Sequence, residues 1–117
     1  MSVAEPNVQS ILLGDAIEHA PAAVLVADDD GRYVAVNCYA CRLLGYTRSE
    51  FLELTVTDVA QSPEASAEFA QLVSTRRLDG TTRLRRKDGS EVDFDYRAGE
   101  TSIAGMTYYV AVGWPAE

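Results

Sequence analysis

The spacing of hydrophobic residues in the first part of the chain is helical. Between Val8 and Ala20 apolar residues recur at three- and four-residue intervals, which predicts a short amphipathic helix that ends before Pro21. The predicted apolar stripe consists of Val8, Ile11, Leu12, Ala16 and Ile17. Because this helix lies outside the main domain, its stripe needs a partner, and a second copy of the chain is one candidate.

The pattern then changes to that of a β-hairpin. Two runs rich in β-branched residues, Val24–Ala27 and Tyr33–Val36, flank Asp29-Asp30-Gly31, which suits a three-residue loop with Gly31 in the left-handed conformation. The register expected from this loop joins unlike charges and joins valine to valine, pairing Asp28 with Arg32 and Val26 with Val34.

Short helices are predicted in the middle of the chain. Asn37 is a good N-cap for a helix over Cys38–Leu44, and Gly45 suits its C-terminal stop. Thr47 and Glu50 have the spacing of a capping box for the next turn, and a further turn is expected near Asp58. A longer helix is expected over residues 63–76, with Ser62 as its cap and Pro63 at its first position. Its inward residues are predicted to be Phe69, Leu72 and Val73.

Strict alternation marks a second hairpin, which turns at Lys87-Asp88-Gly89, with Gly89 in the left-handed position. The same loop register predicts three cross-strand pairs, Leu84 with Val92, Arg83 with Asp93, and Arg85 with Glu91. One face then carries Thr82, Leu84, Val92, Phe94 and Tyr96. The segment "MTYYVAVGW" follows a turn at Gly105 and predicts a last strand that is apolar on both faces.

The order of elements predicts an α+β fold, with a five-stranded antiparallel sheet, short helices packed on one face, and an additional N-terminal amphipathic helix. We expect a leader and helix over residues 1–20, one domain over residues 21–114 and a tail over residues 115–117. A chain of 117 residues suits one such domain.

The composition of the chain indicates which kinds of partner it can bind and in which compartment it is expected. The net charge of −8 disfavours direct binding to nucleic acid or to an anionic membrane surface. No apolar stretch approaches the length of a membrane span, and the first ten residues lack the pattern of a signal peptide. Two cysteines without an export signal predict a reducing, cytoplasmic location.

Five segments in order resemble a PAS domain, the small sensory module of bacterial signalling proteins. They are "AAVLVADDDGRYVAVN", "RLLGYTRSEFL" preceded by an Asn, "TDVAQSPEA", "RRKDGSEVDFDYRA" and "YYVAVG", and the match runs from about Asp15 to Gly113. Glu53 stands where the family often has Gly, and the Asp-Ile-Thr that often ends the last strand is absent. The resemblance implies a sensor in two-component signalling or transcription regulation, with a ligand cavity between the sheet and helices.

The C-x-x-C motif of Cys38 and Cys41 raises the question of redox or metal chemistry. A thiol oxidoreductase is disfavoured because the helix that carries the motif ends after about two turns. A zinc site within one chain is disfavoured because zinc usually needs four ligands, and the chain offers two cysteines and the single histidine His19. We predict that Cys41 packs as a small apolar residue and that Cys38 lies near the surface. The run Asp28-Asp29-Asp30 lacks the alternate spacing of a calcium loop and is interpreted as a solvated hairpin. No metal site and no catalytic constellation is predicted.

Cofactors that the family uses would leave recognisable residues. A flavin photo-adduct needs a cysteine after the L-G-Y turn, as does a thioester-linked chromophore, and none follows Cys41. Haem relatives usually ligate iron through a histidine on the helix that corresponds to residues 63–76, which contains none. No cofactor is therefore predicted, and the core is either plain or holds a small non-covalent ligand. The pocket candidates are Tyr46, Phe51, Val59, Phe69, Leu72, Leu84, Phe94, Tyr96 and Val110.

The leading hypothesis is a non-enzymatic sensory module that dimerises and signals to an effector domain or partner protein. The homodimer contact is expected on the N-terminal helix and on the outer face of the last strand, with Val8, Ile11, Leu12, Ile17, Tyr109 and Ala111. The alternatives are a photo- or redox-sensor that carries flavin or haem, and a thiol oxidoreductase.

Overall fold

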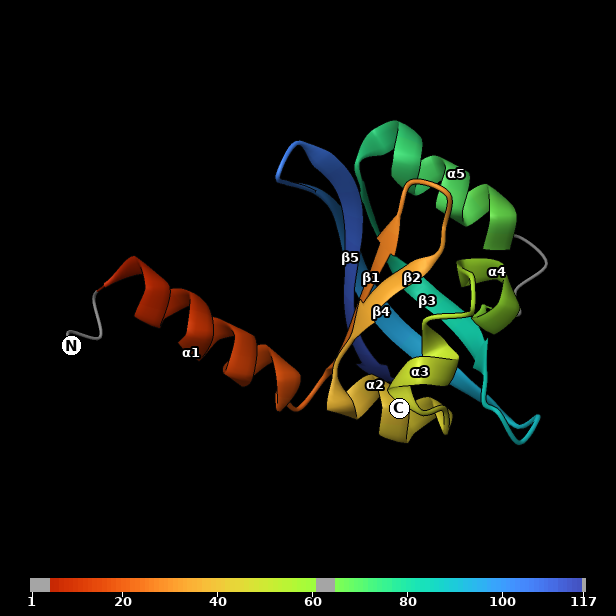
Figure 1. The fold of residues 1–117 in the computed structure, drawn as a ribbon. Coiled ribbons are helices and arrows are strands. Elements are labelled where there is room, and N and C mark those ends of the chain that lie inside the picture. Colours follow the sequence, from red (N-terminus) through yellow and green to blue (C-terminus); the bar gives the residue numbers. More distant parts are fainter. Residues whose placement is uncertain (1–4, 61–64, 117) are drawn as a thin grey trace.

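The computed structural model describes residues 5–60 and 65–116. Five strands form one antiparallel sheet in the order β2-β1-β5-β4-β3 (Figure 1). The strands are β1 (Ala23–Asp28), β2 (Tyr33–Val36), β3 (Arg77–Arg85), β4 (Glu91–Ile103) and β5 (Met106–Pro115). The helices are α1 (Pro6–Glu18), α2 (Cys38–Leu44), α3 (Arg48–Phe51), α4 (Val56–Val59) and α5 (Ala65–Thr75). The predicted fold class is confirmed.

Helices α2 to α5 lie over one face of the sheet, whereas α1 extends away from it (Figure 1). The predicted N-terminal helix exists and runs without a break through Gly14, but none of its residues is buried. Its apolar side chains therefore contribute almost nothing to the core of a single chain, as expected for a segment that needs an external partner.

The second hairpin has the predicted register. Leu84 pairs with Val92, Arg83 with Asp93 and Arg85 with Glu91. The ion pairs do not follow this strand pairing one to one. Arg83 contacts both acidic residues, Asp93 at 3.2 Å and Glu91 at 3.4 Å. The predicted inward face is also observed, with Leu84 and Phe94 buried.

The first hairpin departs from its predicted register. Asp28 N–H donates to the Arg32 carbonyl at 2.9 Å, as expected, but Val26 pairs with Ala35 instead of Val34. A β-bulge between Val26 and Ala27 accounts for the shift of one residue. Val34 is 42% exposed as a result, and the prediction that two valines face each other was wrong.

Caps and turns follow the sequence closely. Asn37 caps α2, and Thr47 and Glu50 form the predicted capping box of α3. Four glycines at predicted turns have positive φ, Gly31 at 82°, Gly45 at 82°, Gly89 at 89° and Gly105 at 79°. The predicted cap Ser62 and first helical residue Pro63 lie outside the described residues. On α5, Leu72 is buried as predicted, but Val73 is 39% exposed because it lies on the side of the helix away from the sheet.

The apolar interior is divided into two clusters. The main core surrounds Leu44 of α2, Phe51 of α3 and Val59 of α4, whose side chains are fully buried. A second cluster joins Leu72 of α5 to Ala98 and Tyr109 of the sheet. Residues of both clusters line the space described next.

Candidate functional site

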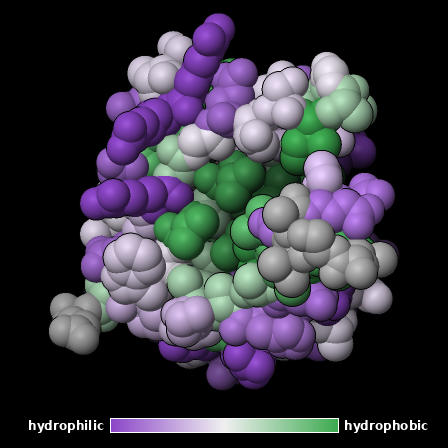
Figure 2. All heavy atoms as spheres, turned by 90° about the vertical axis from the view of Figure 1, so that its left-hand side faces the viewer, coloured by the Kyte–Doolittle hydropathy of each residue, from purple (hydrophilic) through white to green (hydrophobic). Residues whose placement is uncertain are grey.

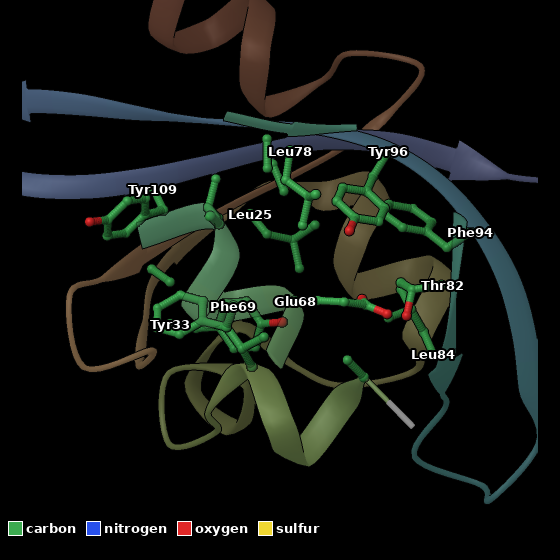
Figure 3. A pocket seen from close by; sticks show the side chains of 16 residues that line it. Leu25, Tyr33, Glu68, Phe69, Leu78, Thr82, Leu84, Phe94, Tyr96 and Tyr109 are labelled. Atoms are coloured by element: carbon green, nitrogen blue, oxygen red, sulfur yellow. The ribbon is translucent and has the colours of Figure 1, made fainter. Parts of the chain in front are cut away.

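A cavity of about 100 Å³ lies between α5 and the sheet (Figure 3). Its apolar wall comes from all five strands or their edges, from the α4 region and from α5: Leu25, Ala27, Tyr33, Val56, Ala60, Phe69, Leu72, Leu78, Leu84, Phe94, Ala98, Tyr109 and Ala111. Two aromatic pairs form part of this wall, Phe69 against Tyr109 at a centroid distance of 5.8 Å and Phe94 stacked on Tyr96 at 6.5 Å. The cavity is thus the point where the main core and the second cluster meet.

Five of the nine pocket candidates line this cavity, namely Phe69, Leu72, Leu84, Phe94 and Tyr96. Four candidates do not line it. Val110 is on β5, and the other three lie in the main core or against it: Tyr46, Phe51 and Val59. Tyr46 packs edge-on against Phe51 with ring centroids 5.6 Å apart. These three side chains support the helices that enclose the cavity, so their placement in its wall was wrong.

The two faces of β5 are the reverse of those predicted. Tyr109 and Ala111 line the cavity, and Tyr109 is 5% exposed. Because side chains alternate along a strand, Val110 lies on the outer face. The prediction of Tyr109 and Ala111 as outer dimer residues, and of Val110 as a pocket residue, is therefore corrected.

The sequence reasoning missed the polar members of the cavity, Glu68 and Thr82. Glu68 precedes Leu72 by four residues, a spacing that places both on one side of α5. Thr82 was predicted on the inward face of the hairpin but not recognised as a wall residue. Both positions were therefore accessible to a pattern argument that asked for polar groups on inward faces.

The polar groups of the cavity lie in apolar surroundings. The Thr82 Oγ1 atom is buried and has no hydrogen-bond partner among the described residues. Burial raises the pKa of Tyr96, and the nearby charges of Glu68 and Asp79 raise it further. Burial likewise raises the pKa of Tyr33, with a contribution from Asp58. These phenols therefore remain neutral hydrogen-bonding groups over the physiological range.

A second group of contacts joins α1 to the domain through Asn37. The Asn37 side chain is buried and makes four hydrogen bonds. Its Oδ1 atom accepts from the backbone N–H of Val24 at 3.0 Å and of Ala40 at 3.1 Å. Its Nδ2 atom donates to the carbonyl of Ile17 at 2.8 Å and of Ala22 at 2.9 Å. One amide therefore connects the end of α1, β1 and the start of α2, and all its hydrogen-bonding capacity is used.

Glu18, at the end of α1, makes further contacts with α2 and α3. The Cys38 thiol donates to Glu18 Oε1 at 2.8 Å, and Arg48 forms an ion pair with the same carboxylate. Arg48 Nε also donates to the Val36 carbonyl at 3.3 Å. The Cys38 hydrogen bond and the Arg48 guanidinium hold the pKa of Glu18 below its usual range. The last residue of α1 is thereby attached to α2 and α3.

Comparison with known proteins gives the family. The model of the PAS domain family matches residues 21–110. The chain belongs to the PAS domain family. No curated protein matches the chain.

Solved PAS domains share the fold at low sequence identity. The PAS domain of an HTR-like protein from Haloarcula marismortui is 24% identical with a TM-score of 0.83, over 94% of this chain and 93% of that chain. A PAS domain from a two-component sensor histidine kinase is 14% identical with a TM-score of 0.84, over 96% of this chain and 100% of that chain. A domain of a sensor histidine kinase/response regulator from Geobacter sulfurreducens is 23% identical with a TM-score of 0.77, over 96% of this chain and 98% of that chain. At these identities the likeness establishes the PAS fold alone.

The cavity of this PAS domain does not fit a flavin or a haem. Pockets for drug-sized ligands measure about 300–1,000 Å³, whereas this one is about 100 Å³. Its described wall contains neither the cysteine of a flavin adduct, nor a histidine for haem iron, nor a cation for a phosphate or propionate. The residues present suit a much smaller, mainly apolar molecule.

The two cysteines of the PAS domain have the properties of structural thiols. Both are free, and Cys38 is engaged with Glu18. Burial raises the pKa of Cys41; Arg48 lowers it to a smaller extent, and Cys38 and Glu18 raise it further, so the fraction of reactive thiolate is reduced. The geometry therefore gives no support to a nucleophilic thiol at Cys41.

The Asp28-Asp29-Asp30 run forms part of the β1–β2 turn. The three carboxylates lie within 4.8 Å of one another. Asp28 Oδ1 accepts from the backbone N–H groups of Asp30 at 2.9 Å and Arg32 at 3.0 Å, so this carboxylate closes the hairpin loop.

The side of the PAS domain from which α1 projects is partly apolar. Figure 2 shows hydrophobic surface in the middle of this side, surrounded by hydrophilic residues. On α1, Ile11, Leu12, Leu13 and Ile17 are between 47% and 65% exposed. On the outer face of the sheet, two valine pairs cross from β1 to β5, Val24 with Val112 and Val26 with Val110. No helix among the described residues has the length and apolar character needed to cross a membrane.

Proposed function

We propose that this PAS domain is a non-enzymatic cytoplasmic sensory module that binds a small ligand non-covalently and passes a conformational signal to an effector domain or partner protein. The observation that carries the proposal is the cavity between α5 and the sheet, with its apolar wall and its few polar groups. A ligand there touches α5 and residues of all five strands of the sheet. Its binding free energy therefore acts on the packing of the helix against the sheet.

The junction at Asn37 supports a route for that signal. Leu25 and Ala27 of β1 line the cavity, and the neighbouring Val24 N–H is held by Asn37, which also holds the end of α1. A shift of β1 on ligand binding would therefore reach α1 through a single buried amide. Partner domains of a two-component kinase or a transcription regulator would receive it.

A cavity-filling variant tests the ligand site. Ala98→Phe adds a phenyl ring to the β4 wall, and we expect it to abolish the binding of small apolar ligands in amide chemical-shift titrations by NMR. Val73→Phe on the exposed side of α5 is the matched control and is expected to bind as the wild type does. Equal binding by wild type and Ala98→Phe would exclude this cavity as the ligand site.

We also propose that the module acts as a homodimer through α1 and the two valine pairs of the outer face. The exposed Ile11, Leu12 and Ile17, together with Val8, supply the helical part of this contact. Light scattering of the full chain should report a dimer, and Ile11→Glu should shift it to monomer while Gln9→Glu on the same helix should not. Deletion of residues 1–14 without any change in solution mass would refute the contact.

A cofactor-bearing photo- or redox-sensor is the second candidate, and the size of the cavity counts against it. The visible absorption spectrum of the purified protein discriminates the two, because bound flavin or haem absorbs strongly there. For a thiol oxidoreductase, replacement of both Cys38 and Cys41 by Ser would have to abolish a measurable reductase activity.

A further inference from the structure

Three polar side chains of the cavity wall can form hydrogen bonds to a ligand. Glu68 of α5, Thr82 of β3 and Tyr96 of β4 all contribute to the wall, and Figure 3 shows their side chains directed into the cavity. The buried Thr82 hydroxyl has no hydrogen-bond partner among the described residues. Native proteins rarely leave a buried polar atom unpaired, so this hydroxyl points to a group that a ligand supplies.

The charge around the cavity is negative. Among the described residues, Glu68 is the only charged member of the wall, and no Arg, Lys or His lines it. Beyond the wall, Asp79 acts on Tyr96 and Asp58 acts on Tyr33, each in the direction expected of a nearby negative charge. An anionic ligand would meet repulsion in these surroundings, whereas a cationic one would be attracted.

A basic group that acts on one wall residue, Arg76, is already engaged in an ion pair. Arg76 acts on Tyr109, another wall residue, in opposition to the carboxylates of Glu100 and Asp29. Arg76 Nε lies 3.5 Å from Glu100 Oε2, so its charge is largely offset locally. At the Tyr109 end of the cavity, two carboxylates thus act against one guanidinium.

The remaining wall sets the size and character of the ligand body. A cavity of about 150 Å³ lined by aliphatic and aromatic side chains accepts benzene. At about 100 Å³, this cavity suits an apolar body smaller than benzene, of about four or five carbon atoms. Apart from Glu68, Thr82 and three tyrosines, the wall consists of aliphatic side chains and phenylalanines, so most of the ligand meets apolar atoms.

We propose that the cavity binds a small primary amine with an apolar body, whose ammonium group is held by the Glu68 carboxylate and the Thr82 hydroxyl. The assignment rests on the proposed function, since it requires this cavity to be the ligand site. An ammonium group donates three hydrogen bonds, and charge-assisted bonds to a carboxylate are stronger than neutral ones. Glu68 already has an interaction within the protein, but a carboxylate offers about four acceptor positions, which leaves room for a further donor.

Three probes with the same branched skeleton test the charge preference. They are 3-methylbutylamine, 3-methylbutan-1-ol and 3-methylbutanoate, which at pH 7 are cationic, neutral and anionic. Titration of the full chain, followed by amide chemical shifts in NMR, should give an affinity at least about tenfold higher for the amine than for the alcohol, and no binding of the carboxylate. Affinity for the alcohol equal to or above that for the amine would overturn the amine assignment and leave the ligand site standing. Absence of binding by all three probes would overturn both.

Substitutions then locate the ammonium group. Glu68→Gln should lower the affinity for 3-methylbutylamine about tenfold and leave that for the alcohol nearly unchanged, because the charge and not the space is altered. Glu91→Gln, at an exposed strand position, is the matched control and should change neither affinity. Thr82→Val removes the hydroxyl at nearly constant volume and should weaken the binding of both probes. Unchanged amine binding by both Glu68→Gln and Thr82→Val would refute the assignment.

Discussion

Asn37 is the residue whose replacement tests the connection between α1 and the sheet most directly. Replacement of Asn37 by Ala removes the four hydrogen bonds of its side chain and leaves the backbone otherwise unchanged. Two of them hold N–H groups, one at the start of α2 and one in β1. The other two hold carbonyls, at Ile17 and Ala22.

The size of the effect follows from what each lost bond leaves behind. Loss of an N-cap costs about 1 kcal/mol. The Val24 N–H and the Ala22 carbonyl are part-buried, and leaving each unpaired costs about 1 kcal/mol at the lower end of the usual range. The Ile17 carbonyl adds no such cost, because it still accepts from the Ala20 N–H at 3.2 Å. The sum is about 3 kcal/mol, a large share of the roughly 5–15 kcal/mol by which domains are stable. For a domain of this size, it corresponds to a fall in Tm of roughly 15 °C.

Urea denaturation monitored by circular dichroism measures this difference. The matched control is Thr47→Ala, which removes the N-cap of α3, an exposed cap that holds a single N–H group at 3.2 Å. We expect about 1 kcal/mol for the control and about three times as much for Asn37→Ala. Equal losses in the two variants would refute the reasoning, since the bonds to α1 and β1 would then contribute nothing.

Asn37→Asp separates the two halves of the amide. The carboxylate keeps the acceptor for the N–H groups of Val24 and Ala40, but it replaces the donor with an oxygen that faces the carbonyls of Ile17 and Ala22. Repulsion between these oxygens should release the end of α1 while the cap of α2 survives. Hydrogen exchange should then accelerate over residues 17–22 and remain slow in α2. Loss of protection in α2 as well would contradict this division.

Three further predictions concern the strands, the thiol and the surface ion pairs. In Gly113→Ala the new Cβ would lie 2.3 Å from the Asp95 carbonyl oxygen, so we expect a loss of about 3 kcal/mol in urea denaturation, whereas Gly14→Ala, with no atom within 4 Å, should lose none. Cys38→Ala removes a donor from Glu18, and the pKa of that carboxyl, followed by NMR titration, should rise toward its usual value; an unchanged pKa would exclude the thiol contact. The pKa of Glu50 is lowered from 4.5 to about 2, chiefly by its hydrogen bond from Lys87, so the folded state binds fewer protons than the unfolded one between these values. The stability that Glu50 contributes is therefore present above pH 4.5 and lost as the pH falls toward 2; thermal melts should show a shallower acid dependence for Glu50→Gln, and identical pH profiles would exclude the effect.

Local signals with a specific physical cause were predicted well from the sequence. A helix start needs an oxygen that accepts from exposed N–H groups, and Asn37 and Thr47 are the residue types that provide one. The Lys87-Asp88-Gly89 loop fixes the register of β3 and β4 because only one pairing places Leu84 opposite Val92 on the buried face. In both cases one residue type and one position decide the structure.

The faces of β5 could not be predicted because its apolar residues occupy both sides. Alternation carries information only when one side is polar, and in "YYVAV" each register buries an equally apolar set. The choice is made by neighbours distant in sequence: Phe69 of α5 packs against Tyr109, and Val26 of β1 pairs with Val110. The bulge in the first hairpin is similar, since nothing near Val34 signals the extra residue.

The same reasoning explains why the pocket candidates were only partly correct. A search restricted to large apolar side chains cannot separate a cavity wall from a filled core, because both are made of the same residue types. Phe51 and Phe94 are both buried, yet Phe51 lies within the packed helices and Phe94 faces the cavity. The residues that distinguish the two environments are polar, and here they are Glu68 on the inner side of α5 and Thr82 on an otherwise apolar strand face. A polar residue at an inward position is costly in a filled core and useful beside a ligand, so it is the better signal of a binding site in a fold of this kind.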